Sequence, residues 1–337
     1  MPRKAQQRGK KKMDPAAMEY YFAPLEGNTG YVYRNVHYRF FPETDRYYTP
    51  FVAPNHTLRF RTKEMDDIDP AHNAGVPLVP QVLSNRSQEC LWAIRELAQM
   101  GYKEVNLNLG CPVPTVARKR RGSGMLKYTQ ELDAFLEEVF EGVEGTGTAV
   151  SVKTRLGTDS TEEAEGLIGI YNRYPISELT VHPRSQKDMY KGTPDYDAFA
   201  AVLCKSRIPI VYNGNIFTGE DRDRLLERFP QVRKIMAGRG VLADPALIRV
   251  LKGGPALQKA ELRAFHDALL DAYKKTLPGT NVVIGRMKEF WHYTGTLFPE
   301  GENLRKEIRK ARDLGAYEAA VRVLMSSVPM NGSYSGQ

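Results

Sequence analysis

The chain has 337 residues, of which 42% are hydrophobic and 26% are charged, the balance of a folded protein rather than a disordered one. Its length allows one large domain or two unequal ones. No apolar run approaches the ~18 residues of a membrane-spanning helix, and no apolar segment follows the basic N-terminus as it would in a secretory signal. Three cysteines without a Cys-x-x-Cys pair argue against a disulfide scaffold and a structural zinc site. We therefore expect a cytoplasmic protein without a membrane segment or a bound metal.

The net charge of +8 is concentrated at the two ends of the chain. Residues 1–12 carry six basic side chains and no acidic one, and residues 251–337 carry 13 basic against 9 acidic side chains. This distribution favours a partner held electrostatically at the periphery. From charge alone, a nucleic acid and a purely solubilising arm are equal alternatives. The sequence gives no sign of an obligate protein partner.

Eight short apolar or β-branched runs alternate with amphipathic segments between Tyr20 and Val241. Such continuous runs are typical of strands buried on both faces. Eight βα units in this order predict a (β/α)8 TIM barrel, and an open doubly wound sheet is the alternative that periodicity does not exclude. The expected strands are Tyr20–Gly27, Arg46–Ala53, Pro77–Ser84, Glu104–Gly110, Ala149–Gly157, Glu178–Arg184, Ile208–Asn215 and Lys234–Val241.

After about Pro255 no strand-like run occurs, and three apolar stripes with helical spacing follow. One of them consists of Leu262, Phe265 and Leu269. They predict a small C-terminal helical bundle packed on the barrel. The expected organisation is a disordered basic arm over residues 1–18, a catalytic barrel over 19–252, a helical domain over 253–326 and a disordered tail over 327–337.

One cysteine lies where a barrel carries its chemistry, at the C-terminal end of a strand. Cys111 follows the fourth expected strand, and Pro112 keeps it on a loop because the residue before a proline avoids the helical region. The other two cysteines, Cys90 and Cys204, fall on apolar helix faces and are expected to pack as small hydrophobic residues. For Cys111 a reactive thiol and a half-buried loop thiol both remain open.

Polar residues also end the other expected strands. Glu26, Gln81, Lys153, His182 and Arg184 would converge at one end of a barrel, which indicates a ligand pocket rather than five separately satisfied core residues.

Two glycine turns close the seventh and eighth expected strands. They are Asn213-Gly214-Asn215 and Gly238-Arg239-Gly240. Barrels frequently bind phosphate at the loops after these two strands, and glycine lets backbone N–H groups approach an anion closely. The turns therefore predict a phosphorylated cofactor or substrate.

Taken together, these motifs resemble those of the tRNA dihydrouridine synthases, flavin enzymes that reduce uridine in tRNA. Two positions depart from the usual pattern, because Asn215 stands where aspartate is common and Ser123 where alanine is common. The residues that carry the resemblance are, in order, Phe22-Ala23-Pro24-Leu25-Glu26-Gly27, Gln81, Asn106 to Pro112, Lys153-Thr154-Arg155, His182-Pro183-Arg184-Ser185, Asn213-Gly214-Asn215 and Gly238-Arg239-Gly240.

The resemblance implies an FMN cofactor and assigns residues to it. Three consecutive residues would line the flavin ring through backbone contacts, two side chains would hydrogen-bond the ring edge, a histidine would lie beside the ring, and the glycine turns would hold the phosphate and ribityl chain. In that order these residues are Pro24, Leu25 and Glu26; Gln81 and Lys153; His182; and Asn213, Gly214, Asn215, Gly238 and Arg239.

The resemblance also implies a reaction. Asn108 and Arg184 would face the substrate uracil, and Cys111 would donate a proton to C5 while reduced flavin delivers hydride to C6. The resemblance further implies that NADPH reduces the flavin. The sequence has no Rossmann glycine fingerprint, which is consistent with transient binding of NADPH at the same face. The C-terminal helices and the basic clusters would bind tRNA.

Two other functions remain open at this point. An FMN-dependent barrel oxidoreductase acting on a free pyrimidine-type molecule would need neither basic ends nor a helical RNA module. A non-catalytic RNA-binding barrel would have kept the fold and lost the chemistry.

Overall fold

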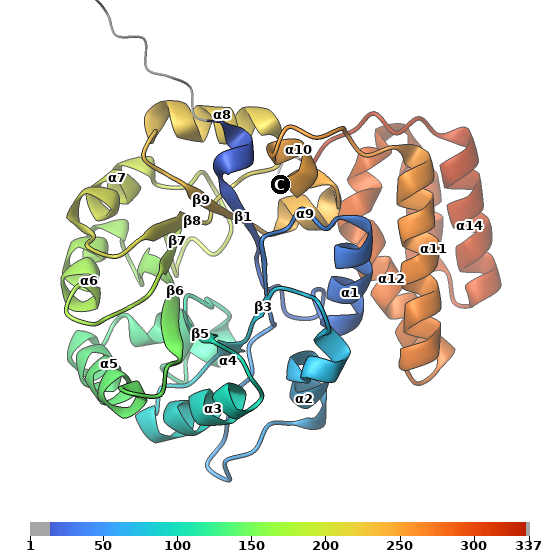
Figure 1. Cartoon of the computed structure of the whole chain (residues 1–337). Coiled ribbons are helices and arrows are strands. Elements are labelled where there is room, and N and C mark those ends of the chain that lie inside the picture. The colour runs from blue at the N-terminus through green and yellow to red at the C-terminus, as the bar shows by residue number, and fades with distance from the viewer. Residues whose placement is uncertain (1–13, 335–337) are drawn as a thin grey trace, which may run out of the picture.

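The computed structural model describes residues 14–334, in which a parallel sheet closes into a barrel (Figure 1). The strand order is β3-β2-β1-β9-β8-β7-β6-β5-β4. The two end strands of this order are separated in the chain by one residue, Pro80, so the sheet closes on itself. The strands are β1 (Glu19–Phe22), β2 (Arg46–Tyr48), β3 (Leu78–Val79), β4 (Gln81–Val82), β5 (Glu104–Leu109), β6 (Ala149–Gly157), β7 (Leu179–Ser185), β8 (Ile210–Tyr212) and β9 (Lys234–Ala237).

Pro80 explains why the described chain has nine strands where eight were expected. A proline has no N–H to donate, so the third expected strand is divided into β3 and β4. The carbonyl of Pro80 still accepts a hydrogen bond from the Asn106 N–H at 2.9 Å, which holds the two halves in line. The predicted (β/α)8 barrel is thereby confirmed, and the open sheet is excluded.

Four of the expected strands end at least three residues earlier than expected. The second stops at Tyr48 and the seventh at Tyr212. The first strand stops at Phe22, so Pro24, Leu25 and Glu26 lie on a loop beyond it. The eighth stops at Ala237, and the Gly-Arg-Gly turn begins the short helix α9 (Arg239–Ala243). Glycine at 238 starts that helix directly above the strand, which turns the chain at the barrel mouth.

Helices cover the outside of the barrel (Figure 1). Their apolar faces pack on the strands, and one is capped as its sequence suggests, with the Thr218 side chain accepting from the Asp221 N–H. They are α1 (Tyr31–Phe40), α2 (Thr62–Ile68), α3 (Ser87–Gln99), α5 (Thr129–Val143), α6 (Ala164–Tyr171), α7 (Tyr196–Lys205), α8 (Gly219–Arg228) and α10 (Leu247–Leu251). The short helix α4 (Pro114–Ala117) buries no residue and lies in the loop after β5.

Buried polar side chains close the N-terminal end of the barrel. Glu178 accepts hydrogen bonds from the Tyr21 hydroxyl at 3.2 Å and from Lys234 Nζ at 2.6 Å. Arg46 pairs with Glu104 at 2.7 Å across the same end. Because these side chains occupy the N-terminal end of the barrel, a ligand can enter from the C-terminal end.

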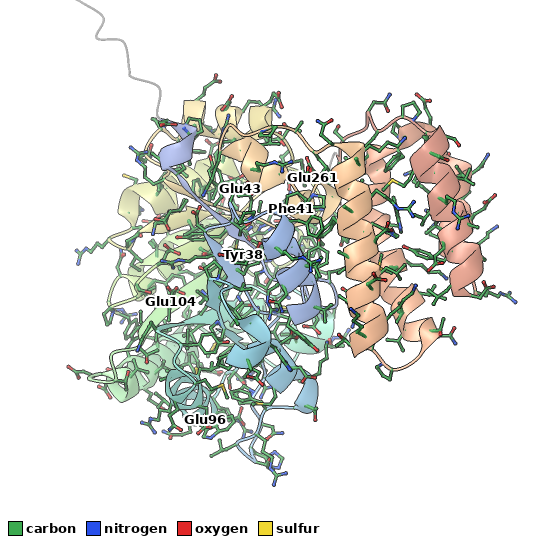
Figure 2. All side chains as sticks on the ribbon, turned by 45° about the vertical axis from the view of Figure 1, so that its right-hand side comes forward. Tyr38, Phe41, Glu43, Glu96, Glu104 and Glu261 are labelled. Carbon is green, nitrogen blue, oxygen red and sulfur yellow. The ribbon has the colours of Figure 1, made fainter. Side chains whose placement is uncertain are left out.

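The C-terminal helices pack against one side of the barrel, with α14 outermost (Figure 1). Phe265 of α11 lies in edge contact with Phe41 at 5.4 Å between ring centroids, and Arg249 pairs twice with Glu261 at the same seam (Figure 2). The apolar residues Leu262 and Leu269 are buried as expected. The helices are α11 (Lys259–Thr276), α12 (Thr280–Thr294), α13 (Glu302–Lys310) and α14 (Leu314–Ser327).

Residues 1–18 and 327–337 were expected to be disordered. The parts of them that the structure describes, residues 14–18 and 327–334, are ordered. Pro15–Ala17 form a 3-10 helix and Met18 is buried under it. In the tail, Val328 is buried and the Gly332 N–H donates to the Leu297 carbonyl at 3.0 Å. The residues of both segments that the structure describes therefore pack against the rest of the chain. The basic cluster of residues 1–12 lies outside the described residues.

Between residues 14 and 334, no helix is long and apolar enough to cross a membrane. Within the same span, His, Cys, Asp and Glu side chains form no group of three that could hold a metal ion. Cys90 is buried as expected, whereas Cys204 is exposed at the end of α7 rather than packed in an apolar face.

Candidate active site at the barrel mouth

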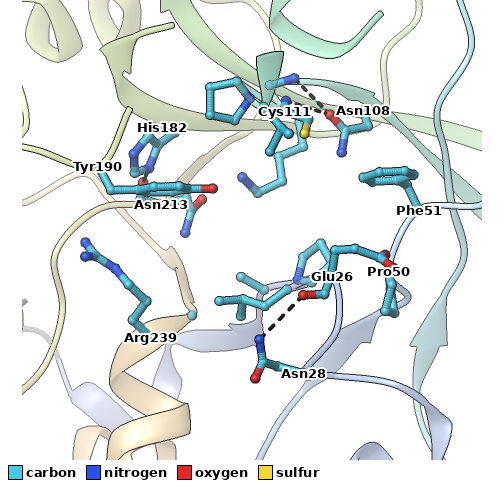
Figure 3. A pocket seen from close by; sticks show the side chains of 18 of the residues that line it. Glu26, Asn28, Pro50, Phe51, Asn108, Cys111, His182, Tyr190, Asn213 and Arg239 are labelled. Carbon is cyan, nitrogen blue, oxygen red and sulfur yellow. Dashed lines mark hydrogen bonds between the residues drawn. The ribbon is translucent and has the colours of Figure 1, made fainter. Parts of the chain in front are cut away.

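A cavity of about 490 Å³ opens at the C-terminal ends of the strands (Figure 3). Its volume lies within the range of ligand pockets. The structure brings most of the expected site residues to its wall: Pro24, Leu25, Glu26, Gln81, Asn108, Cys111, Lys153, His182, Asn213, Gly214, Gly238 and Arg239. Asn215 and Arg184 are not among its lining residues.

Asn108 fixes the loop that carries the thiol. Its side-chain oxygen accepts from the Gly110 N–H at 3.1 Å and from the Cys111 N–H at 2.9 Å (Figure 3). Its amide nitrogen donates to Gln81 Oε1 at 2.7 Å. With both ends of the amide engaged, the side chain has one orientation, and Cys111 is held at the strand tip.

The amide chain continues into the barrel. Gln81 Nε2 donates to Asn106 Oδ1 at 2.7 Å, and Asn106 Nδ2 donates to Ser151 Oγ at 2.9 Å. These side chains are buried, where an unpaired polar group would be costly. The chain sets the direction of every amide, including the one beside Cys111.

A second segment supports Cys111 from behind. Gly122 has φ +57°, and a Cβ there would lie 2.8 Å from the Cys111 carbonyl oxygen. Ser123 Oγ donates to that same oxygen at 2.9 Å. The serine that replaces the common alanine thus adds a hydrogen bond to the cysteine loop.

Burial and neighbouring cations set the protonation of two groups in the cavity. Burial raises the pKa of the Cys111 thiol, with Lys153 and Arg155 opposing this in part, so the thiol is protonated at neutral pH. Burial and the charge of Arg155 lower the pKa of Lys153 to about 7. In the absence of a bound anion, the Lys153 amine is therefore only partly protonated near neutral pH.

His182 is neutral and has a defined tautomer. Burial and the nearby cations, first Arg155 and then Lys153, hold its pKa well below the usual value. Nδ1 lies 2.6 Å from the Asn213 carbonyl oxygen, an acceptor, so Nδ1 carries the hydrogen. Nε2 lies 3.2 Å from Arg184 Nη1, a donor, and so accepts. His182 thus presents no acidic proton to the cavity.

Arg184 lies behind His182 instead of facing the cavity. It is 1% exposed. It donates to the carbonyl oxygens of Lys191 and Gly192, at 3.1 and 2.5 Å, and to Asn215 Oδ1 at 3.2 Å. Asn215 Oδ1 also accepts from Arg239 at 3.2 Å. In this structure Arg184 and Asn215 brace the loops of the mouth and do not line it.

The cavity wall also includes residues that were not predicted from the sequence as site residues. Arg155 is buried and donates to the Gly110 and Ser185 carbonyl oxygens at 3.0 and 2.8 Å, which ties three strand ends together. Tyr190 is 50% exposed, with the guanidinium carbons of Arg155 and Arg239 at 5.2 and 5.4 Å from its ring centroid. Arg155 belongs to the Lys153-Thr154-Arg155 motif but was given no role there. Nothing in the sequence pattern pointed to Tyr190.

Other cavity residues also lacked a sequence signal. Phe51 and Pro50 lie across from Cys111 (Figure 3). Tyr293 comes from α12, in the helical region. Such a contribution depends on how the two regions pack, which residue spacing does not encode.

The donor set fits a planar ligand with a phosphate. Lys153, Arg155 and Arg239 are basic and Glu26 is the acidic residue among the lining side chains, so the cavity favours an anion. Buried amides can bond the edge of a polar ring. At Gly238 a Cβ would lie 3.3 Å from the Ala23 Cβ, so glycine keeps this turn close to the loop after β1. A flavin with a phosphate group meets all three features.

The fold and the cavity define a (β/α)8-barrel protein with an anion-binding site at its mouth. Residues 21–327 match the model of the dihydrouridine synthase family. The chain belongs to this family, which confirms the resemblance read from its motifs.

Curated relatives carry related names. The chain is similar to a probable tRNA-dihydrouridine synthase 1 from Synechocystis sp., with 30% identity over 67% of this chain and 62% of that protein. It is 31% identical to a tRNA-dihydrouridine(16) synthase from Pseudomonas syringae pv. tomato, over 72% of this chain and 77% of the relative. The chain thus covers less than two thirds of the Synechocystis protein but more of the Pseudomonas one.

Solved structures confirm the barrel. Morphinone reductase superposes with a TM-score of 0.51 at 11% identity, over 73% of this chain and 90% of that chain. At this identity the likeness concerns the fold alone.

Proposed function

We propose that the chain is a tRNA-dihydrouridine synthase that reduces the C5–C6 double bond of a uridine in tRNA. The observation that carries this proposal is the Cys111 thiol at the mouth of a barrel whose cavity is lined by three basic residues. Family membership and the names of the relatives support the substrate.

FMN is the cofactor that we assign to the cavity. Arg239, Gly238 and Gly214 would hold its phosphate end, while Gln81 and Lys153 would bond the ring edge. Reduced flavin supplies the hydride equivalent that C6 of the uracil gains. A cationic Lys153 stabilises negative charge at the ring edge, and its depressed pKa would rise on binding.

Cys111 supplies the proton that C5 gains. Its thiol bears a proton at neutral pH, because burial raises its pKa. Asn108 holds the Cys111 N–H, so the sulfur keeps its position when the substrate enters. The thiolate left after transfer is stabilised by Lys153 and Arg155, the same cations that oppose the rise of its pKa.

NADPH is the reductant that we assign to restore the reduced flavin. The resemblance to the family supports this assignment, and the sequence has no Rossmann glycine turn that would bind the dinucleotide permanently.

The tRNA would reach the mouth with its uracil turned out of the stack. Arg118 and Lys119 are exposed on the loop after Cys111 and would contact phosphates. In the same run, Arg120 pairs with Glu131 at 2.6 Å and Arg121 with Glu89 at 3.3 Å, so these two serve the fold as well. A tRNA substrate would place the protein in the cytoplasm.

The decisive experiment compares Cys111→Ala with the unchanged protein. The variant should retain the visible absorbance of bound flavin and lose dihydrouridine formation in unmodified tRNA. Turnover at the wild-type rate would remove the acid role of Cys111. Turnover of free uracil in place of tRNA would favour a small-molecule oxidoreductase.

A further inference from the structure

Three aromatic rings from distant parts of the chain meet at the rim of the cavity. Phe217 follows β8, Tyr293 ends α12, and Tyr334 lies in the segment after α14. The ring centroids of Tyr334 and Phe217 are 5.0 Å apart at 74°, and those of Tyr334 and Tyr293 are 6.1 Å apart at 57°. Both distances are those of favourable aromatic pairs.

The cluster stands at the phosphate end of the cavity. Phe217 and Tyr293 line the cavity together with Arg239. The Arg239 guanidinium carbon lies 5.7 Å from the Phe217 ring centroid. Tyr334, half-buried, contacts both rings and is not among the residues that line the cavity, so it lies in a second layer around Arg239.

The segment that carries Tyr334 is docked at several points. Lys259 Nζ donates to the Val328 carbonyl oxygen at 2.6 Å, and the Gly332 N–H donates to the Leu297 carbonyl at 3.0 Å. A Cβ at Gly332 would lie 2.2 Å from the Thr296 carbonyl oxygen. Only glycine fits there, so the approach of the segment to the end of α12 depends on this residue.

We propose that Tyr334 is a positioning residue for the cofactor: with its segment it forms the outer wall of the phosphate end and retains the bound flavin. This inference rests on the proposed flavin site. Arg239 is partly buried, and the Phe217 ring, which Tyr334 contacts, covers part of its guanidinium. An ion pair with a phosphate is stronger where such cover reduces contact with water. The helical region would then complete the cofactor site in addition to any contact with RNA.

The test measures flavin release rather than turnover. Tyr334→Ala removes the ring, and Gly332→Val displaces the segment without changing the ring. Ser333→Ala, at an exposed neighbouring position, is the matched control, and Tyr334→Phe keeps the ring without the hydroxyl. Each holoprotein is diluted, and the recovery of free-flavin fluorescence gives the dissociation rate.

We expect Tyr334→Ala and Gly332→Val to release FMN on the order of tenfold faster, the scale of one or two lost aromatic contacts. Ser333→Ala and Tyr334→Phe should stay at the wild-type rate. Riboflavin, which lacks the phosphate, should bind all five proteins, wild type included, with the same affinity.

Unchanged FMN release in both Tyr334→Ala and Gly332→Val would overturn the inference. If the KM for tRNA then rose instead, the rings would be a stacking surface for RNA. The result is separable from the proposed function, because faster flavin release is measured without tRNA and stands even if the holoprotein forms no dihydrouridine. Failure to bind FMN at all would overturn both.

Discussion

The side-chain oxygen of Asn108 accepts a hydrogen bond from the backbone N–H of Cys111 at 2.9 Å. This contact links the buried amide chain of the barrel to the loop that presents the thiol. The position of the sulfur is therefore set from inside the barrel, through Gln81 and Asn108, together with the support that Ser123 gives to the Cys111 carbonyl oxygen.

Replacing Asn108 with alanine should lower kcat by about 100-fold, because a misplacement of about 1 Å at a reacting group has this effect. Flavin should remain bound, since Arg239 and Lys153 are untouched. Single-turnover reduction of tRNA by the pre-reduced holoprotein measures the step directly. A normal single-turnover rate would show that Cys111 does not need this contact.

The pKa of Lys153, lowered to about 7 by burial and Arg155, predicts a pH effect on cofactor binding. The apoprotein loses this cation as pH rises through 7, so its affinity for FMN should fall as pH rises above about 7, up to the higher pKa that Lys153 has in the complex. Lys153→Arg keeps the charge and should flatten the profile. Titration of apoprotein with FMN at each pH gives the dissociation constants, and a flat wild-type profile would contradict this prediction.

Arg184 is buried and holds the carbonyl oxygens of Lys191 and Gly192. Lysine in Arg184→Lys lacks the planar guanidinium that donates to both carbonyl oxygens at once. The substitution should lower the free energy of unfolding by about 2 kcal/mol. Hydrogen exchange should also speed up across residues 186–195. Lys191→Ala is the control, because the backbone carbonyl and not the exposed side chain is the acceptor. Unchanged stability with a raised KM for tRNA would instead indicate direct contact with uracil.

Gly122→Ala introduces a Cβ 2.8 Å from the Cys111 carbonyl oxygen at a residue with φ +57°. Gly101→Ala is the matched control: its φ is +97° and nothing lies within 4 Å of the added Cβ. Strain alone should cost about 1–2 kcal/mol in either variant. Urea denaturation should show the larger loss for Gly122→Ala, and only this variant should lose dihydrouridine formation. If the two variants lost the same stability and both kept activity, the cysteine loop would have to shift to accommodate the added Cβ without harm to the site.

Binding of tRNA should depend on salt through the exposed pair Arg118 and Lys119. Each replacement by glutamine should reduce the slope of log affinity against log salt by roughly 0.7–0.9. Arg207→Gln is the control, since Arg207 is exposed just before β8, at the opposite end of the barrel. Filter binding over a range of salt concentrations measures the slopes, and identical slopes in all variants would exclude these phosphate contacts.

The sequence by itself determined the barrel and most of the cavity wall. Buried parallel strands read as continuous apolar runs, and a barrel brings the residues after those runs to one mouth, as with Cys111, Lys153 and Arg239. Both results follow from the local hydrophobic pattern of the strands and from the topology of the barrel. The stop of the first strand at Phe22 and the break at Pro80 shifted boundaries without moving the site.

Tertiary structure alone decided which polar residues face the cavity and which brace it. Lys153 lies within β6, Arg184 within β7 and Asn215 in the turn after β8. Lys153 lines the cavity, whereas Arg184 donates to two loop carbonyl oxygens and to Asn215, because the direction of a long side chain depends on the partners that packing brings near. Tyr190, Tyr293 and Tyr334 reach the mouth from a loop, a helix and the C-terminal segment. Such long-range contacts have no period in the chain, so only the folded structure reveals them.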